Sequence, residues 1–404
     1  MLFRTWEAAG PVADVAFVDG HLVVTRHALV KRILADPDLF RPDNALDAVS
    51  PMPVAALRVL AGHGFRLPPT LANNHGASHP AIRSATAAAL HPARVAALRP
   101  WLTSVVAGRV ERLRAASGPV DLYADLAADL PLLVLARLVD LPPAPTAVVK
   151  EFTRAALELF WAPVSGERQL ALADIVGRFH AQLRDFAATG PGLAAQLRAA
   201  GHPLDVVVGA LFFLLVAGQE TTSQFLTLLM HRIAATPGLA ASIRDGHVRV
   251  DDVVEEGLRL DPPIVTWRRV TARDTVVADL PVPAGTSVVL WLARAGRDPE
   301  VVAAPEEFHP GQPGSRRHLS FGAGAHRCVG AQLSRMEAAV VVAGTADLLA
   351  GAEVVRAPWC PDNLSFRMPD SFVVRTAKEG PLVNAEALTR GPSFSASGRS
   401  GGCR

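Results

Sequence analysis

The chain contains, at residues 321–330, the stretch FGAGAHRCVG, and a helical pattern follows at once from Ala331 to Leu349. The glycines at 322 and 324 allow the backbone to turn tightly and to approach a flat ligand. Cys328 comes just before the expected helix N-terminus, where the helix dipole and free N–H groups favour thiolate over thiol. The stretch therefore predicts an ionised cysteine beside a flat ligand, and Gly330 leaves space where the helix passes beneath a ring.

A second informative stretch lies in a long candidate helix, residues 205–231, which would extend about 40 Å. Its apolar run at 211–216 is followed by Ala217-Gly218-Gln219-Glu220-Thr221-Thr222. A carboxylate and hydroxyls placed there are costly if they are buried without partners. Either the apolar stripe ends and these groups face water, or Glu220 and Thr221 form an acid–alcohol pair for proton transfer. The pattern alone leaves both interpretations open.

Two further pairs share one helical face by their spacing. Glu256 and Arg259 are three residues apart in a helix expected over Val250–Leu260, which Asp261-Pro262-Pro263 ends. His79 and Arg83 are four residues apart. By itself, such a pair is most often a solvated surface pair.

The remaining chain predicts a mainly α protein with small antiparallel β-sheets (α+β). A hairpin is expected over 12–25 around Asp19-Gly20, and the segment 41–72 reads as loops and short helices. We predict a single domain over 1–388 and a disordered tail over 389–404. The other expected elements are a helix over 27–35, mainly helical structure over 78–239 broken at Pro131, Pro142-Pro143, Pro163 and Pro191, and strands over 275–277, 286–292 and 366–375.

Composition narrows the class of protein. The 404 residues carry a formal net charge of +2, which gives no indication of a nucleic-acid partner. The three cysteines, Cys328, Cys360 and Cys403, imply no disulfide framework and favour a reducing cytosol. The N-terminus shows no signal peptide, and the apolar stretch 206–217 is too short to span a bilayer. We therefore expect a cytoplasmic protein without a membrane segment.

The stretch 321–330 closely resembles the haem-binding signature of the cytochrome P-450 family, Phe-Gly-x-Gly-x-His-x-Cys-x-Gly. Residues 217–221 resemble the family's Ala/Gly-Gly-x-Asp/Glu-Thr pattern, and Glu256 with Arg259 resembles its Glu-x-x-Arg. The resemblance covers nearly the whole chain, apart from the tail and parts of 40–75. It implies the cytochrome P-450 fold, with haem between the long central helix and the helix after the cysteine.

The resemblance also implies roles for individual residues. Cys328 is the metal ligand, on the iron of heme b, and its electron donation favours O–O bond cleavage. Gly218 leaves a gap for oxygen, Thr221 hydrogen-bonds the dioxygen co-substrate and Glu220 relays protons, while Thr222 is a neighbour of less certain role. The pair Glu256 and Arg259 is structural. The remaining haem contacts are Ala217, Phe321, Gly322 and Gly330, with His79, Arg83, Arg269 and His326 on the propionates and Arg268 as an alternative to Arg269.

The sequence departs from the family pattern in two places. After Phe308-His309-Pro310, Gln312 stands near the slot where relatives usually carry an arginine that bridges the Glu-x-x-Arg pair. Arg316 or Arg317 are candidates to substitute for it. Gly296 replaces a commoner asparagine. These departures concern the network around Glu256 and Arg259 and not the haem site.

By resemblance, the substrate contacts are mainly apolar, which predicts a substrate with a sizeable apolar part. The chain shows no flavin or iron–sulfur motif, so the resemblance implies a separate ferredoxin and ferredoxin reductase. Arg94, Arg99, Arg327 and Arg335 could form a basic face for an acidic partner, or could be scattered surface residues. The expected contacts are Leu71, Phe213, Ala217, Val265 and Phe366, together with Phe212, Thr266 and Leu364, with Phe160 and Trp161 in an access lid.

The activity that we expect is that of a haem-thiolate monooxygenase that hydroxylates a largely apolar small molecule, in secondary metabolism. Two alternatives remain open at this point. A peroxide-driven haem-thiolate enzyme is disfavoured by the retained Glu220 and Thr221, since peroxide already supplies protons and electrons. A non-catalytic haem protein that binds gas is disfavoured because no second signalling domain is visible.

Overall fold

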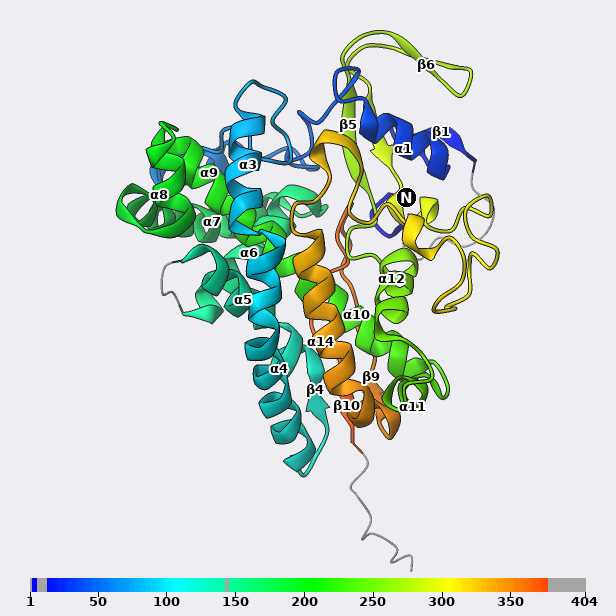
Figure 1. Cartoon of the computed structure of the whole chain (residues 1–404). Helices are drawn as coiled ribbons and strands as arrows, with labels where there is room; N and C mark the ends of the chain where they lie inside the picture. Colours follow the sequence, from blue (N-terminus) through cyan, green and yellow to red (C-terminus); the bar gives the residue numbers. More distant parts are fainter. Residues whose placement is uncertain (1, 6–12, 142–144, 377–404) are drawn as a thin grey trace, which may run out of the picture.

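The computed structural model describes residues 2–5, 13–141 and 145–376. Helices make up most of it, and three small sheets lie at its edges (Figure 1). The predicted tail over 389–404, with Cys403, falls outside the described residues. The helices are α1 (His27–Ala35), α2 (Val54–Gly62), α3 (His79–Ala89), α4 (Pro92–Ala115), α5 (Leu130–Val139), α6 (Thr146–Trp161), α7 (Gly166–Thr189), α8 (Gly192–Ala199), α9 (Leu204–Leu215), α10 (Thr221–Ala235), α11 (Leu239–Arg244), α12 (Val250–Leu260), α13 (Leu292–Ala295) and α14 (Ala331–Ala350).

The largest sheet has the strand order β1-β2-β8-β5-β3. Its hairpin turns at Asp19-Gly20, where Val18 faces His21, as predicted. The strands β2 and β8 are parallel, and the other neighbouring pairs of this sheet are antiparallel. The two smaller sheets have the orders β4-β10-β9 and β6-β7. The strands are β1 (Val15–Val18), β2 (His21–Val24), β3 (Phe40–Arg41), β4 (Val120–Asp121), β5 (Trp267–Thr271), β6 (Thr275–Val277), β7 (Leu280–Val282), β8 (Ser287–Leu290), β9 (Glu353–Arg356) and β10 (Val373–Arg375).

The strand expected over 366–375 is present only at its end. Its first residue, Phe366, forms an isolated bridge with Ile264. The backbone N–H groups of Ser365 and Phe366 donate instead to the side chain of Asn363, at 2.9 and 2.8 Å. Because that amide oxygen takes the donors that a sheet partner would need, the segment turns before β10 begins.

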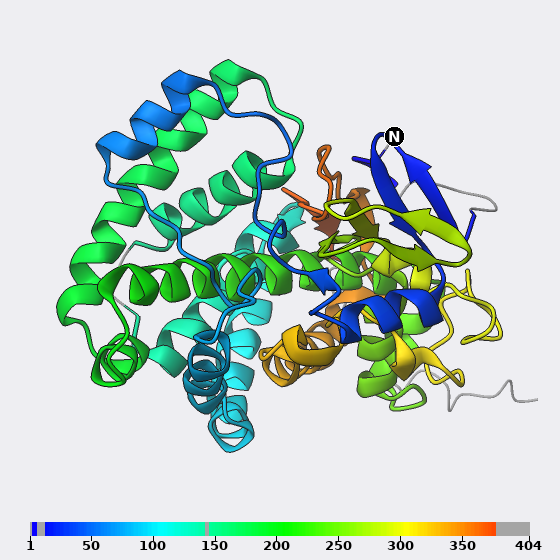
Figure 2. The ribbon, with the colours of Figure 1, turned by 90° about the horizontal axis from the view of Figure 1, so that it is seen from above.

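The long central helix runs from one edge of the molecule through its middle (Figure 2). It runs from Leu204 to Ala235, and a π-helical segment, η3 (Val216–Glu220), joins α9 to α10. The predicted helix over 205–231 is thus confirmed, with one turn wound more loosely than expected. With a mean hydropathy of 1.6, the helix is long and apolar enough to span a bilayer by length and composition, contrary to our estimate from 206–217. However, 61% of the most apolar 18-residue stretch of this helix is buried inside the protein, which is typical of a core helix.

Most buried apolar side chains form one core around the central helix, and a smaller core lies between the large sheet, α1 and α13. Helix α14 packs along both α4 and α10 (Figure 1). This arrangement places the N-terminus of α14 next to the π-helical segment. The two stretches that the sequence singled out therefore meet inside the molecule.

Candidate functional site

A large cavity lies where the central helix, the cysteine loop (residues 318–330) and β5 converge. Its walls are mainly apolar, and its charged lining residues are Arg83, Arg269 and Arg327, with His326 beside them. Cys328 lines the cavity together with Phe321, Gly322 and Gly330. The central helix contributes Ala217, Gly218, Thr221 and Thr222.

The cysteine loop is shaped by its two glycines, as predicted. Gly322 and Gly324 have φ angles of +65° and +68°, which L side chains rarely adopt. At Gly324 an added Cβ would also lie 2.6 Å from the carbonyl oxygen of Leu34. The backbone N–H of Cys328 donates to the carbonyl of Phe321 at 2.9 Å, and α14 begins three residues later. The loop thus presents the sulfur at the cavity wall.

Two opposing effects act on the pKa of the Cys328 thiol. The thiol opens into the cavity, but it lies deep among protein atoms, and this burial raises its pKa. A backbone hydrogen bond from Gly330 and the positive charges of Arg83, Arg327 and Arg335 act in the opposite direction. A cation bound to the sulfur would add the remaining stabilisation of the thiolate.

One edge of the cavity gathers cationic and imidazole groups, and several of their nitrogen atoms lack hydrogen-bond partners. His79 and His326 stack with ring centroids 4.4 Å apart, and His79 Nε2 and His326 Nδ1 have no hydrogen-bond partner. Arg269 Nε is also unpartnered, and burial lowers the pKa of Arg269 to about 10. Arg83 donates to the carbonyl of Arg327 at 2.7 Å. Buried donors of this kind require an acceptor, and an anionic one satisfies the charge as well.

The structure decides between the two arginines of β5. Arg269 lines the cavity, whereas Arg268 turns to the opposite face and donates to the carbonyls of Ala45 and Asp47. Neighbouring residues of a strand point to opposite faces, so only one of them could reach the site.

These observations fit the haem that the resemblance implies. A sulfur donor, a mainly apolar enclosure and a cationic edge with unsatisfied donors are the features that a propionate-bearing macrocycle needs. Within the described ranges no group of three or more His, Cys, Asp or Glu side chains is placed to hold a metal ion. The single sulfur of Cys328 is therefore the metal-ligand candidate that the geometry supports.

The π-helical segment faces the cavity with Val216, Ala217 and Gly218, and Thr221, the first residue of α10, also lines it. Thr221 Oγ1 donates to the carbonyl of Ala217 at 2.6 Å. Gly218 lines the cavity, and a Cβ there would meet Leu135 of α5 at 3.2 Å. The missing side chain lets α5 approach the central helix closely, and the gap for oxygen stays a prediction. Thr222 also reaches the cavity and donates to Ser334 on α14 at 3.3 Å.

Glu220 points away from the cavity, into a polar cluster on α6 that the sequence did not reveal. Its carboxylate is fully buried and contacts Lys150 Nζ at 2.9 Å and Thr153 Oγ1 at 2.8 Å. Gln224 Nε2 lies 3.3 Å from its other oxygen. Neither interpretation drawn from the pattern is complete, because the acid is buried rather than solvated, and it is paired rather than facing the cavity.

Only some of the predicted substrate contacts line the cavity. Leu71, Phe213, Ala217 and Phe366 line the cavity. Val265 does not: it is buried in a separate small core, and its neighbour Ile264 lines the cavity instead. Trp161 and Trp267 join the lining, the second of them missed by the sequence analysis. The other expected contacts, which lie outside this cavity's walls, are Phe160, Phe212, Thr266 and Leu364.

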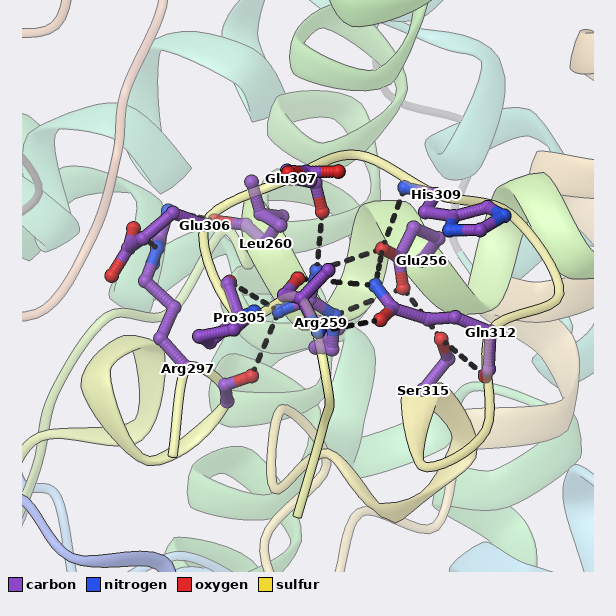
Figure 3. A network of polar contacts seen from close by, with 12 residues as sticks. Glu256, Arg259, Leu260, Arg297, Pro305, Glu306, Glu307, His309, Gln312 and Ser315 are labelled. Carbon is purple, nitrogen blue, oxygen red and sulfur yellow. Dashed lines mark hydrogen bonds and ion pairs between the residues drawn. The ribbon is translucent and has the colours of Figure 1, made fainter. Parts of the chain in front are cut away.

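The Glu256–Arg259 pair is the centre of a buried network (Figure 3). Arg259 donates to both carboxylate oxygens of Glu256, at 2.9 and 2.7 Å, and also to the carbonyls of Gly296, Pro305 and Glu307. Gln312 fills the slot of the missing arginine, because its Nε2 donates to Glu256 Oε1 at 2.6 Å.

Neither candidate substitute for that arginine takes part. Arg316 pairs with Asp252 at 3.0 Å, and the carbonyl of Arg317 accepts from His27. Burial would raise the pKa of Glu256, but hydrogen bonds from Arg259 and Ser315 lower it, so the carboxylate stays ionised. The neutral amide of Gln312 therefore stands in place of the usual second arginine, and Arg259 is the one cation that hydrogen-bonds to Glu256.

The four arginines proposed as a basic face are not equivalent. Arg94, Arg99 and Arg327 are exposed. Arg335 is only partly exposed and is held by Glu255 through two hydrogen bonds, at 2.5 and 3.1 Å. Its charge is therefore matched inside the protein, and it is not a free surface cation.

Comparisons with known proteins agree with this site. Residues 202–345 match the family model described as Cytochrome P-450. The erythromycin C-12 hydroxylase of Saccharopolyspora erythraea is 30% identical over 331 residues, 78% of each chain. The cyclomarin C epoxidase CymV of Salinispora arenicola is 30% identical over 292 residues, covering 69% of this chain and 73% of the relative. The solved structure of cytochrome P-450 CREJ with (4-ethylphenyl) dihydrogen phosphate superposes with a TM-score of 0.86 at 27% identity, covering 90% of this chain and 94% of that one.

The substitution Gln312→Ala tests the role of the amide in the buried network. It leaves one oxygen of an ionised, buried carboxylate without a donor, so we expect a loss of about 1–3 kcal/mol in the free energy of unfolding. Denaturant unfolding at pH 7 measures this loss, with Gln332→Ala on the exposed side of α14 as the matched control. Equal midpoints for the two variants would contradict the assignment.

The substitution Gln312→Glu tests the direction in which stability changes with pH. A second carboxylate facing Glu256 would have a raised pKa, because of burial and the like charge. Its destabilising effect should be largest at pH 7 and should shrink as the pH falls toward 5 and the new acid takes up a proton.

Proposed function

This chain belongs to the cytochrome P-450 family and is a monooxygenase, and we propose that it uses heme b and dioxygen to hydroxylate a neutral, largely apolar, ring-bearing small molecule of secondary metabolism. The observation that carries the proposal is the placement of the Cys328 sulfur in an apolar cavity whose edge holds unpartnered cationic and imidazole groups. We assign the electron supply to a separate ferredoxin and its reductase, and the location to the cytoplasm.

Residues of this chain would hold the haem from three sides. Cys328 Sγ would bind the iron, and Phe321, Gly322 and Gly330 would border the macrocycle. When bound, thiolate-ligated haem iron supplies dioxygen activation, because electron donation by the sulfur favours O–O bond cleavage. The propionates would accept hydrogen bonds from Arg269, from His326 and the His79 ring stacked on it, and from Arg83. Arg269, His326 and His79 each have a nitrogen without a partner, whereas Arg83 lines the cavity and also donates to the carbonyl of Arg327.

We propose that protons reach the cavity along the central helix. Lys150 is 15% exposed and contacts the fully buried Glu220, so the pair links solvent to the helix interior. Thr221 is the next residue and carries its hydroxyl on the cavity side. Thr221 Oγ1 would hold the proton to be delivered, while Glu220 and Lys150 would replenish it from outside.

The substrate class follows from an aromatic wall in the cavity. Trp161 and Trp267 lie with ring centroids 6.4 Å apart and an interplanar angle of 26°. Phe366 stands nearly perpendicular to both, at 5.0 and 6.3 Å. The charged lining residues belong to the haem edge, so this wall offers packing to neutral rings and no counter-charge to an ion. We therefore propose a neutral substrate that carries a ring system.

The substitution Cys328→Ser tests the haem assignment. We expect the reduced wild-type protein with carbon monoxide to show the strongly red-shifted main band of a thiolate-ligated haem, and the variant to lack it. Cys360→Ser, at the other described cysteine, is the control and should keep the band. Wild-type protein that binds no haem, or a variant that retains the band, would overturn the proposed function.

The substitution Thr221→Val tests proton delivery. We expect product formed per electron pair to fall by about a hundredfold, in the range of general acid catalysis, with the remaining electrons released as hydrogen peroxide. Thr227→Val is the matched control, since the buried Thr227 makes the same bond to the carbonyl four residues back and does not line the cavity. A similar loss in both variants would point to helix damage instead.

The substitution Trp267→Leu tests the substrate class. Displacement of iron-bound water can be titrated with paired probes, a neutral fused-ring hydrocarbon and its carboxylate. We expect the neutral probe to bind wild type at least about tenfold more tightly, and the variant to lose about three- to tenfold for that probe. Trp359→Leu, at the half-exposed Trp359, is the control. Preference for the carboxylate would refute a neutral substrate.

A further inference from the structure

Helix α12 carries two adjacent acids that serve different networks. Glu256 turns to Arg259 and Gln312, whereas Glu255 turns to the cysteine loop and α14. Glu255 is only 4% exposed. Its carboxylate accepts hydrogen bonds from Arg335 at 2.5 and 3.1 Å and contacts His318 Nε2 at 3.2 Å. This cluster has no place in the functions assigned so far.

Three groups in the described part of the chain face the Glu255 carboxylate: Arg335, His318 and, at 3.8 Å from Oε1, the exposed Arg316. Two of them, Arg335 and His318, reach the cysteine loop through Phe321. The guanidinium carbon of Arg335 lies 4.5 Å from the centroid of the Phe321 ring, and the His318 ring lies 5.9 Å from it. Phe321 borders the cavity, and its carbonyl accepts the backbone N–H of Cys328 at 2.9 Å. Two contacts therefore connect the Glu255 carboxylate to the residue that holds the backbone of the sulfur ligand.

A second connection fixes the start of the loop. The backbone N–H of Ser320 donates to His318 Nδ1 at 3.2 Å. Since Nδ1 accepts, Nε2 carries the proton and donates to Glu255. The hydroxyl of Ser320 donates to the carbonyl of Leu258, also on α12, at 2.5 Å. The loop is thus attached to α12 on both sides of Leu319.

The charges of the cluster are balanced close to the sulfur. Burial alone would raise the pKa of Glu255, but hydrogen bonds from His318 and Arg335 lower it to about 2. The acid is therefore ionised at neutral pH and matches the charge of Arg335. Further cations near Cys328 are Arg83 and Arg327.

We propose that Glu255 is a positioning residue for the sulfur ligand, acting through Arg335, His318 and Phe321. It fixes the loop that presents Cys328, and it limits the positive field that Arg335 exerts there. This inference rests on the proposed function, because it assumes that Cys328 binds haem iron. Removing the carboxylate should have two separable effects, a looser sulfur position and an unmatched positive charge.

The variant Glu255→Gln tests both effects without relying on turnover. Its reduced carbon monoxide complex should lose the thiolate band at least about threefold faster than wild type on mild heating. The midpoint potential should rise, by at least about a threefold change in the ratio of reduced to oxidised protein at a fixed applied potential. Asp251→Asn is the matched control, since it removes an exposed acid of the same helix, whereas Asp252 shares Arg316 with Glu255.

The double variant Glu255→Gln/Arg335→Leu separates charge from position. Its potential should return toward wild type, because the unmatched charge is gone, while the band should stay short-lived. If Glu255→Gln does not fold, Arg335→Lys replaces it as the test. That variant keeps the charge but loses the two-point hydrogen bond, so the band should decay faster at a nearly unchanged potential.

Three outcomes would overturn the inference. They are wild-type band lifetime and potential in Glu255→Gln, equal shifts in Glu255→Gln and Asp251→Asn, or a wild-type band lifetime in Arg335→Lys. Absence of the thiolate band from wild-type protein would instead refute the proposed function. The two failures are therefore distinguishable in one set of spectra.

Discussion

The cysteine loop has little regular structure, so contacts from outside must hold it at the cavity wall. Helix α12 supplies many of them through two neighbouring acids, Glu255 and Glu256. Glu256 organises the segment that leads into the loop, by accepting from the backbone of His309 and from the side chains of Gln312 and Ser315. Glu255 secures the loop itself. The position of the sulfur thus depends on buried carboxylates about seventy residues upstream.

Such buried charges add little net stability, because desolvation offsets most of the attraction. Their value here is geometric, since each carboxylate can accept several donors in one arrangement only. Gln312 shows how the arrangement survives a loss of charge. It keeps the donor to Glu256 and removes one buried cation, leaving Glu256 and Arg259 as a neutral pair.

Much of the architecture was predictable because local signals agreed with the tertiary structure. The Asp19-Gly20 turn, the end of α12 before Pro262 and the glycines of the cysteine loop each dictate backbone geometry directly. Arg268 and Arg269 remained ambiguous because alternation along a strand needs a known register. For the same reason the sequence pointed to Val265 as a cavity residue, whereas its neighbour Ile264 lines the cavity. The roles of Lys150 and Thr153 depend on packing between α6 and the central helix, which no local pattern records.

Glu220 lies in the π-helical turn of the central helix and points away from the cavity that the next residue, Thr221, lines. In a regular helix, Gly218 to Thr221 would follow one another at fixed angles around the axis. Here a π-helical segment precedes Thr221, which faces the cavity, while Gln219 and Glu220 contact Thr153 on α6 and Gln219 also donates to the carbonyl of Ala128. One side of the helix can then carry an apolar cavity wall, and the other an ion pair in contact with solvent through Lys150.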